Sequence, residues 1–414
     1  MIISILGVSG AYADFKNCVA QRDENGNIQY KNKPIYDLKI FNKPQQEYIN
    51  SIDFLLSNFN KEFIFIGTKC AIKFQKDILS TQLKDKNYKF IEIQEDSLND
   101  IFEKIFDILE NTNSQEIMLD ITHGFRHQPI MAIFSSTLSQ FLKHKNLKIL
   151  FAKEIEREKK YEYIYLDNYI EITQLSLLLT GFIKTLNIIP TKKFNLIKLK
   201  SFEEFSKSLL SNDKKGVLKK VNELNSHISE IKDKQELKHL QELFNQIEKI
   251  LQPLLNIENT PEYTQYMTLA TLTLDKNYLV VSLAYMFESL REYCSLKFEP
   301  LLKAKNIHFK NSYYKNTATM DTIANFQRGH KKNDIQKAYP NLYNKNKNIF
   351  SRIDKIYSNL RELRNSLAHI NTEKSFEDIK QDLNTLKFKI ETIYKDDILK
   401  HINYEPTNNI RHKR

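Results

Sequence analysis

Cysteine is scarce in this chain. Only three cysteines occur among 414 residues, and Cys18, Cys70 and Cys294 stand far apart. No two of them have Cys-x-x-Cys spacing, which argues against a zinc knuckle, and their number and separation argue against a disulfide framework. The cysteine content therefore predicts a reducing, cytoplasmic compartment.

Long apolar runs are missing as well. None reaches the roughly 18 residues that a membrane-spanning helix needs. Met1 begins a short apolar run, but no basic segment precedes it, and residues 9–14 soon turn polar. We therefore expect a first strand here rather than a signal peptide.

The composition indicates a folded protein of more than one domain. Apolar residues make up 41% of the chain, enough for real cores, and 414 residues exceed one typical domain. The balance of 62 Lys and Arg against 51 Asp and Glu gives a net charge of +11, which hints at a polyanionic partner. Because Lys, Asn and Ile are abundant throughout, part of this charge reflects overall composition.

Short apolar segments alternate with helical patterns over the first 167 residues. We expect strands at residues 1–6, 63–66, 88–93, 117–121 and 147–152, the last paired with 161–166. Helices are expected at 44–59, from 69 to about 83, at 97–109 and at 129–142. This alternation predicts a doubly wound parallel sheet of strand order 3-2-1-4-5.

Polar residues follow the expected fourth strand, from Asp120 to Arg126, just before a helix. In the predicted sheet this loop lies beside residues 7–12, with Thr68 and Lys69 one strand away. Backbone N–H groups at the helix start and the charge of Arg126 would suit a phosphate-bearing ligand. The alternative is an ordinary strand–helix turn with a capping side chain.

A metal site is a further alternative for the same loop. His123 and His127 stand four residues apart, as two ligands on one helical turn would. Only Asp120 is a nearby third candidate, whereas a catalytic zinc takes three protein ligands. We therefore predict no metal here.

After residue 167 the expected strands stop. Helical patterns are expected at 171–186, 279–296, 353–370 and 376–394, with charged helices between 194 and 255 whose charges favour solvated faces. Residues 303–347 show no clear period, which indicates a long loop or short helices. The second half is therefore predicted to be all-helical.

One polar group stands out in the penultimate helix. Arg364 and His369 form the chain's only Arg-x-x-x-x-His, and Asn365 lies four residues before His369. A histidine that can move protons, an arginine of fixed charge and an amide would suit phosphodiester cleavage. The alternative is a set of polar residues on a helix surface, with a histidine favourable to the helix dipole.

Three motifs together give the chain a resemblance to a known family. They are Asp120-Ile121-Thr122-His123-Gly124-Phe125-Arg126, Leu6-Gly7-x-Ser9-x-x-Tyr12 and Arg364-Asn365-x-x-x-His369. This set resembles the CARF–HEPN ribonucleases of type III CRISPR systems. The resemblance implies a Rossmann-like CARF domain at residues 1–170, a helical connector at 171–258 and a HEPN domain at 259–414.

The resemblance also implies an activity. It implies a homodimer that binds cyclic oligoadenylate as an allosteric activator, needs no other cofactor, and then cuts single-stranded RNA without a metal. Arg364 and His369 would be catalytic and Asn365 supporting. The remaining motif residues in or near the activator pocket would be Ser9, Gly10, Thr122, His123, Gly124 and Arg126. Thr68 and Lys69 are added by the sheet argument alone.

Two other functions stay open from the sequence. The chain could be a non-catalytic nucleotide sensor whose helical half only dimerises or docks a partner. The CARF pocket could also cleave its own cyclic activator, because Ser9, Thr122 and His123 could position a ribose 2′-OH.

Overall fold

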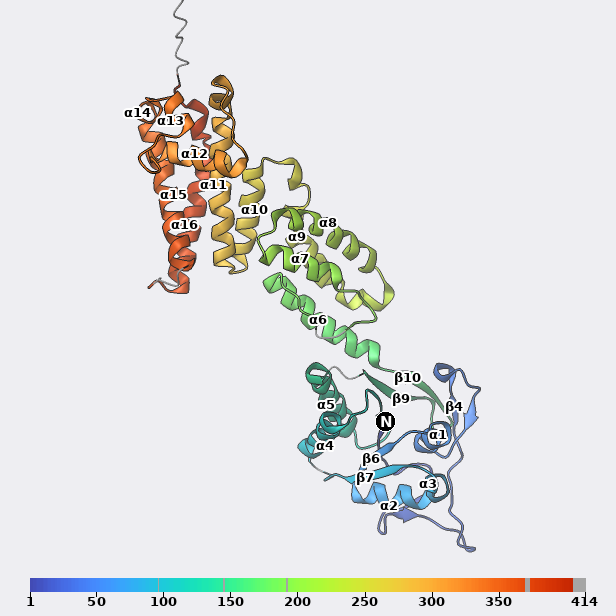
Figure 1. Ribbon diagram of the computed structural model, residues 1–414. Coiled ribbons are helices and arrows are strands. Elements are labelled where there is room, and N and C mark those ends of the chain that lie inside the picture. Colours follow the sequence, from blue (N-terminus) through green and yellow to red (C-terminus); the bar gives the residue numbers. More distant parts are fainter. Residues whose placement is uncertain (96, 144–145, 191–192, 369–372, 405–414) are drawn as a thin grey trace, which may run out of the picture. The chain divides into compact units, whose positions relative to one another are not determined.

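The computed structural model describes residues 1–404 apart from 96, 144–145, 191–192 and 369–372 (Figure 1). The chain divides into two compact units. The first comprises Met1–Leu175 with Pro190–Leu196, and the second comprises Ser176–Ile189 with the chain from Ile197 onward. The predicted boundaries at residues 170 and 258 stay predictions.

The first unit is built on an eight-stranded sheet of order β5-β4-β10-β9-β8-β1-β6-β7. Its strands are β1 (Ile2–Ile5), β4 (Ile35–Asp37), β5 (Gln46–Glu47), β6 (Phe63–Gly67), β7 (Tyr88–Glu92), β8 (Glu116–Asp120), β9 (Asn146–Glu156) and β10 (Lys160–Tyr165). From β7 to β9 the strands are parallel, and β10 pairs antiparallel with β9. The predicted order 3-2-1-4-5 is therefore confirmed.

Helices cover both faces of this sheet (Figure 1). The helices of the first unit are α1 (Ser51–Asn58), α2 (Lys69–Ile78), α3 (Ser80–Leu83), α4 (Leu98–Asn111), α5 (His127–Lys143) and the start of α6 (Asp167–Thr185). Ile2 on β1 belongs to the core under α1–α3, whereas Ile3 belongs to the core under α4 and α5. Neighbouring strand residues point to opposite faces, so a strand buried on both sides is mostly apolar; on β1 only Ser4 is polar, and it donates to Asp120.

The expected helix at 44–59 is wrong in its first part. Gln46–Glu47 form β5, an edge strand antiparallel to β4, and α1 begins only at Ser51. The cause is local, because the Asn50 side chain caps α1 by accepting from the backbone N–H groups of Ile52 and Asp53.

Cys18 and Cys70 form a disulfide, although 52 residues separate them. The number and separation of the cysteines argued against a disulfide framework, and this single disulfide corrects that expectation for Cys18 and Cys70. A small hairpin of β2 (Ala13–Asp14) and β3 (Val19–Ala20) packs on α2, and the Ala20 N–H donates to Asp77 at 3.0 Å. The hairpin thereby carries Cys18 to the first turn of α2, while the third cysteine, Cys294, is buried elsewhere.

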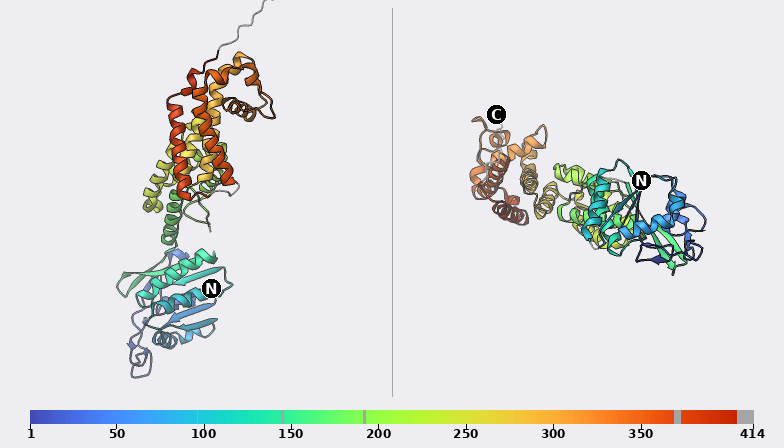
Figure 2. Two further views of the ribbon diagram at one scale, coloured as in Figure 1. Left: turned by 90° about the vertical axis from the view of Figure 1, so that its left-hand side faces the viewer. Right: turned by 90° about the horizontal axis from the view of Figure 1, so that it is seen from below.

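The second unit is helical throughout its described part (Figure 2). Its helices after α6 are α7 (Lys200–Leu210), α8 (Lys214–Ile231), α9 (Gln241–Leu251), α10 (Glu262–Asp275), α11 (Leu279–Ala304), α12 (Ser312–Ile323), α13 (Asp334–Ala338), α14 (Leu342–Lys345), α15 (Lys347–Ala368) and α16 (Phe376–Lys395). Residues 303–347 thus hold three helices. The prediction of a Rossmann-like α/β domain followed by an all-helical region is confirmed. Among the described helices, none is long and apolar enough to cross a membrane.

Candidate functional site

Three of the predicted loops lie at one edge of the sheet. Strand β1 pairs in parallel with both β6 and β8, with Ile5 opposite Ile66 and Ser4 opposite Asp120. The loops that follow these strands therefore emerge side by side at their carboxyl ends, where open α/β sheets bind ligands. The structure brings together the loop residues 7–12, 68–69 and 121–126.

The loops after β1 and β8 touch through two glycines. A Cβ placed on Gly7 would lie 3.1 Å from the backbone nitrogen of Gly124 and 3.1 Å from Cβ of His123. Gly124 itself has a φ of +101°, a conformation that side chains other than glycine rarely adopt. A larger residue at Gly7 would push the two loops apart, whereas a Cβ on Gly124 would meet Ile5 Cγ2 at 2.6 Å and Gln128 Oε1 at 2.7 Å.

Two amide side chains hold the loop after β1. Gln75 on α2 donates to the carbonyl of Gly7 at 2.6 Å. Asn50, the cap of α1, donates to the carbonyl of Ser9 at 3.1 Å and to Gln75 Oε1 at 3.1 Å. Both amides are buried. They fix the backbone on either side of Ser9 and were not singled out from the sequence.

Ser9 and His123 meet across the two loops, with Ser9 Oγ 3.3 Å from His123 Nε2. Burial lowers the pKa of His123, and the nearby Asp120 carboxylate opposes this only in part. The ring is therefore neutral near pH 7, so one ring nitrogen can accept a proton. This pair can orient a hydroxyl or take up its proton.

Two predicted ligand residues have hydroxyls engaged within the protein. Thr122 Oγ1 donates to Asp120 at 2.5 Å and accepts from the Ala152 N–H at 3.0 Å. Thr68 caps α2 by accepting from the Ala71 N–H at 3.3 Å. These two threonines shape the loops at the sheet edge. Asp120 is buried and also accepts from Ser4 at 2.7 Å.

Two cations of the predicted pocket are exposed. Lys69 is the first residue of α2, and Arg126 immediately precedes α5. Both lie where helix N-termini expose backbone N–H groups, so charge and dipole favour an anion at the same place. Gly10, also at this edge, has a φ of +101° and accepts from the Lys31 N–H at 3.2 Å.

His127 does not join His123 in a ligand set. Its ring stacks on Phe125 at 6.2 Å, and its buried Nε2 finds no hydrogen-bond partner among the described residues. Within that same part of the chain, no group of three or more His, Cys, Asp or Glu side chains is arranged to hold a metal ion.

The second predicted constellation lies at the end of α15. Arg364 and Asn365 are both exposed there, and the Arg364 guanidinium carbon lies 4.4 Å from the centre of the Phe287 ring on α11. His369 lies outside the described residues. The structure therefore places two of the three predicted catalytic residues together on one exposed helix end.

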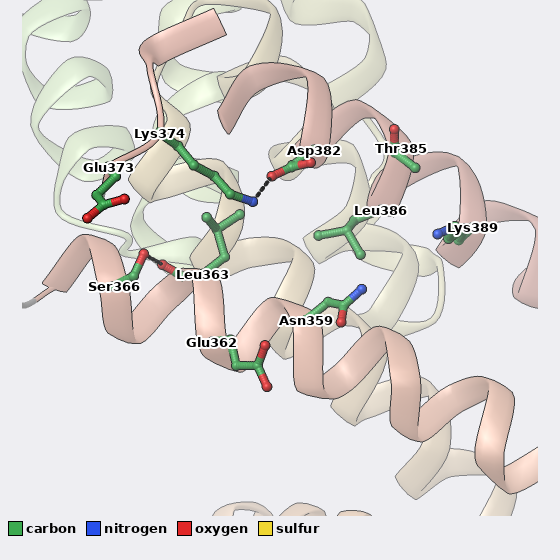
Figure 3. A pocket seen from close by; sticks show the side chains of 10 residues that line it. All are labelled: Asn359, Glu362, Leu363, Ser366, Glu373, Lys374, Asp382, Thr385, Leu386 and Lys389. Carbon is green, nitrogen blue, oxygen red and sulfur yellow. Dashed lines mark hydrogen bonds and ion pairs between the residues drawn. The ribbon is translucent and has the colours of Figure 1, made fainter. Parts of the chain in front are cut away.

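A pocket of about 630 Å³ opens on another side of the same helix (Figure 3). Its lining comprises Asn359, Glu362, Leu363 and Ser366 from α15, Glu373 and Lys374 from the following segment, and Asp382, Thr385, Leu386 and Lys389 from α16. Lys374 pairs with Asp382 at 2.6 Å. Arg364 and Asn365 are not part of this lining, so α15 presents two different polar surfaces.

The first unit is thus a Rossmann-like domain whose sheet edge carries cations and helix N-termini that favour an anion. Comparisons with known proteins show which family this domain is similar to. Residues 19–168 match the family model described as CRISPR system endoribonuclease Csx1, CARF domain. The chain is also similar to a solved structure of Csm6 from Enterococcus italicus bound to cyclic hexa-2′-fluoro-hexa-dAMP. The identity is 13% and the TM-score 0.39, over 96% of this chain and 92% of that one. No curated protein sequence matches.

The family match confirms the CARF part of the resemblance, and it does not extend to the Arg364-Asn365-x-x-x-His369 motif. This chain contains a CARF domain of the Csx1 kind, as CARF-containing accessory proteins of type III CRISPR systems do.

Proposed function

We propose that the protein is a ribonuclease that cyclic oligoadenylate switches on in type III CRISPR defence. The main observation behind this proposal is the match of residues 19–168 to the CARF family model. In the sheet domain that contains these residues, three polar loops lie at one edge. The activator binds at that edge, and the helical unit cuts single-stranded RNA.

The sensor edge suits a cyclic oligoadenylate because it combines cations with small residues. Arg126 and Lys69 supply charge for the phosphates, next to the N-termini of α5 and α2. Gly7, Gly10 and Gly124 keep this edge closely packed, because a Cβ on any of them would lie within 3.1 Å of protein atoms. Ser9 and His123 are placed to contact a ribose hydroxyl.

The nuclease role falls to Arg364, Asn365 and His369. Among the described residues no ion pair engages Arg364, so its guanidinium is available to a phosphate. His369 moves protons, Arg364 stabilises the negative charge of the phosphorane, and Asn365 assists in orientation. The attacking group is the 2′-OH of the RNA itself, which is already tethered to the phosphate.

A homodimer is the active form. On α5, Ile130, Phe134 and Leu138 recur every four residues and are 50%, 57% and 42% exposed. Such an apolar stripe on one helix face favours burial against another surface. The helical unit would need a two-fold contact of its own to bring Arg364 and His369 of two copies to one site. On one straight helix, residues five apart point about 140° apart, so a single copy would not aim both groups at one phosphate.

The test is incubation of the purified protein with a fluorescent RNA, with and without cyclic tetraadenylate or cyclic hexaadenylate. We expect cleavage only with an activator. A protein that binds an activator tightly and leaves RNA intact would instead be the non-catalytic sensor.

Slow cleavage of the activator by the CARF domain is a second candidate. It is favoured by the 3.3 Å approach of Ser9 Oγ to a neutral His123 Nε2, which could take a proton from a ribose 2′-OH. The test is chromatography of the cyclic oligoadenylate after long incubation with wild-type protein and with His123→Ala. Linear products from wild type alone would support this activity.

A further inference from the structure

Arg364 rests on an aromatic ring. Its guanidinium carbon lies 4.4 Å from the centre of the Phe287 ring, within the range where a ring attracts a cation. Arg364 belongs to α15 and Phe287 to α11, and these helices pack against each other. The contact therefore depends on tertiary packing.

The Phe287 ring is itself held firmly. Phe287 is only 4% exposed and stacks on Tyr357 with ring centres 5.0 Å apart and planes 24° apart. Tyr357 precedes Arg364 by seven residues on α15, which is two helical turns, so both lie on the side of α15 that faces α11. Because the ring is held in one position, it can hold the guanidinium of Arg364 in one position as well.

A second guanidinium near this ring has its charge already compensated. Arg291 lies 5.5 Å from the Phe287 ring, is buried, and donates to both oxygens of Glu288 at 2.8 and 3.0 Å. It also donates to Thr317 Oγ1 at 3.2 Å. Arg364 has no such carboxylate among the described residues, so it is the cation here whose charge is free to act on a substrate.

An aromatic ring and a carboxylate differ in how many N–H donors, and how much charge, they leave available on the arginine that they contact. A carboxylate would accept two N–H groups and cancel the charge, as Glu288 does for Arg291. An aromatic ring attracts the cation through its face. It does not accept hydrogen bonds as a carboxylate does, so the five N–H donors of the guanidinium stay available. Phe287 can therefore orient Arg364 while leaving its donors and charge for a phosphate.

We infer that Phe287 is a positioning residue that holds the Arg364 guanidinium in the orientation in which it contacts the scissile phosphate of RNA. This inference rests on the proposed ribonuclease function. In this inference, Phe287, a buried apolar residue on α11, supports RNA cleavage by Arg364 at the end of α15.

The experiment replaces Phe287 in the full-length protein with phenylalanine analogues carrying one, three or five ring fluorines. Fluorination withdraws charge from the ring face and nearly preserves its shape. With activator present, the single-turnover rate of RNA cleavage should fall stepwise, by roughly 3- to 30-fold for the most fluorinated ring. Binding of a non-cleavable 2′-O-methyl RNA and of cyclic oligoadenylate should change little.

Substitutions of Phe287 by natural amino acids test the same inference independently. Phe287→Leu should lose rate as the fluorinated proteins do, and Phe287→Tyr, which keeps the ring, should restore it. In Arg364→Ala the same fluorinated analogues should have no further effect, because the cation they act on is gone.

The outcomes separate this inference from the function on which it rests. If Arg364→Ala is inactive while every fluorinated protein cuts RNA at the wild-type rate, Phe287 has no positioning role and the ribonuclease function stands. If wild type cuts no RNA with any activator, the proposed function and this inference both fall. If wild type cuts RNA and Arg364→Ala stays fully active, the catalytic role of Arg364 and this inference fall, and the ribonuclease function stands.

Discussion

Ser9 Oγ and His123 Nε2 lie 3.3 Å apart although 114 residues separate them in the sequence. One belongs to the loop after the first strand of the sheet and the other to the loop after β8. They meet because β1 lies between β6 and β8, and because Gly7 and Gly124 let the two loops touch. The contact joins two of the three family motifs at one edge.

This burial of His123 predicts a dependence of stability on pH. The pKa of His123 is lowered from its ordinary value of 6.5, mainly by burial. As pH falls through that value, the unfolded chain binds a proton that the folded ring still resists, so stability is lost below about pH 6.5. We expect His123→Gln to lessen the loss of hydrogen-exchange protection in β1 and β8 between about pH 7 and 5.

His227 is the matched control. Its pKa is also lowered by burial, but it lies on α8. His227→Gln should leave the pH dependence of exchange in β1 and β8 as in wild type. An unchanged pH dependence in His123→Gln would mean that this ring titrates normally.

Arg126 should contribute directly to activator affinity. It is exposed at the start of α5, where it can donate to a phosphate oxygen without losing an existing partner. Arg126→Ala should weaken binding of cyclic oligoadenylate by about 1.5–3 kcal/mol, the usual range for a hydrogen bond to a charged group. Titration calorimetry measures this, with Arg157→Ala, an exposed arginine in the β9–β10 turn, as control. Equal affinities in the two variants would mean that the pocket lies elsewhere.

The disulfide should stabilise the first unit. Cys18 and Cys70 close a loop of 52 residues, and removal of such a cross-link costs about 4 kcal/mol in the chain-entropy account. Cys18→Ser should therefore lower the free energy of unfolding of the sheet domain, as measured by urea unfolding. Dithiothreitol should destabilise wild type to a similar extent and leave Cys18→Ser unchanged. A wild type insensitive to the reductant would show that the cross-link adds no stability.

The sequence was sufficient for the five parallel strands β7-β6-β1-β8-β9, but not for the edge strands β4 and β5 or for the supports of the site. The order of β7-β6-β1-β8-β9 follows from apolar strands alternating with helices, a pattern that depends on neighbouring residues only. That order in turn placed Ser9 beside His123. The roles of Thr122 and Thr68 were less accessible, because a threonine at a strand end can contact a ligand or hold its own loop, and here both hydroxyls are engaged within the protein.

Other contacts depend on packing between distant elements and leave no local pattern. Gln75 is one polar residue within the amphipathic helix α2, and nothing nearby indicates that its amide reaches the Gly7 carbonyl. Phe287 is one apolar residue among many on α11, and its contact with Arg364 depends on how α11 and α15 cross. The pairing of Cys18 with Cys70 likewise depends on where the β2–β3 hairpin docks.

The exposed stripe on α5 predicts how dimerisation can be broken. Phe134 is 57% exposed at its centre, and a carboxylate there would have to be buried unpaired in a two-fold contact. Phe134→Asp should yield monomers by light scattering and lower RNA cleavage at equal protein concentration. Leu98→Asp, a similar change at an exposed position on α4, should remain dimeric and active. A dimeric Phe134→Asp would assign the contact to another surface.

Cleavage by the 2′-OH of the RNA, without a metal, is expected to show in the products. Arg364 and Asn365 stand exposed at the end of α15, and the predicted mechanism adds His369 for proton transfer. DNA and 2′-O-methyl RNA should resist cleavage, EDTA should not inhibit, and the products should carry 2′,3′-cyclic phosphate ends. Mass spectrometry of the products identifies these ends.

The same mechanism predicts which substitutions lower the rate of RNA cleavage. Arg364→Ala and His369→Ala should each lower turnover by roughly 100-fold or more, because one loses stabilisation of the phosphorane and the other its proton transfer. Activator binding should stay as in wild type. Arg352→Ala, an exposed arginine earlier on α15, should stay fully active, which separates a local effect from a general loss of positive charge. DNA cleavage at a similar rate, or activity abolished by EDTA and restored by Mg²⁺ or Mn²⁺, would overturn the mechanism and return Arg364 and Asn365 to the role of surface residues on a helix.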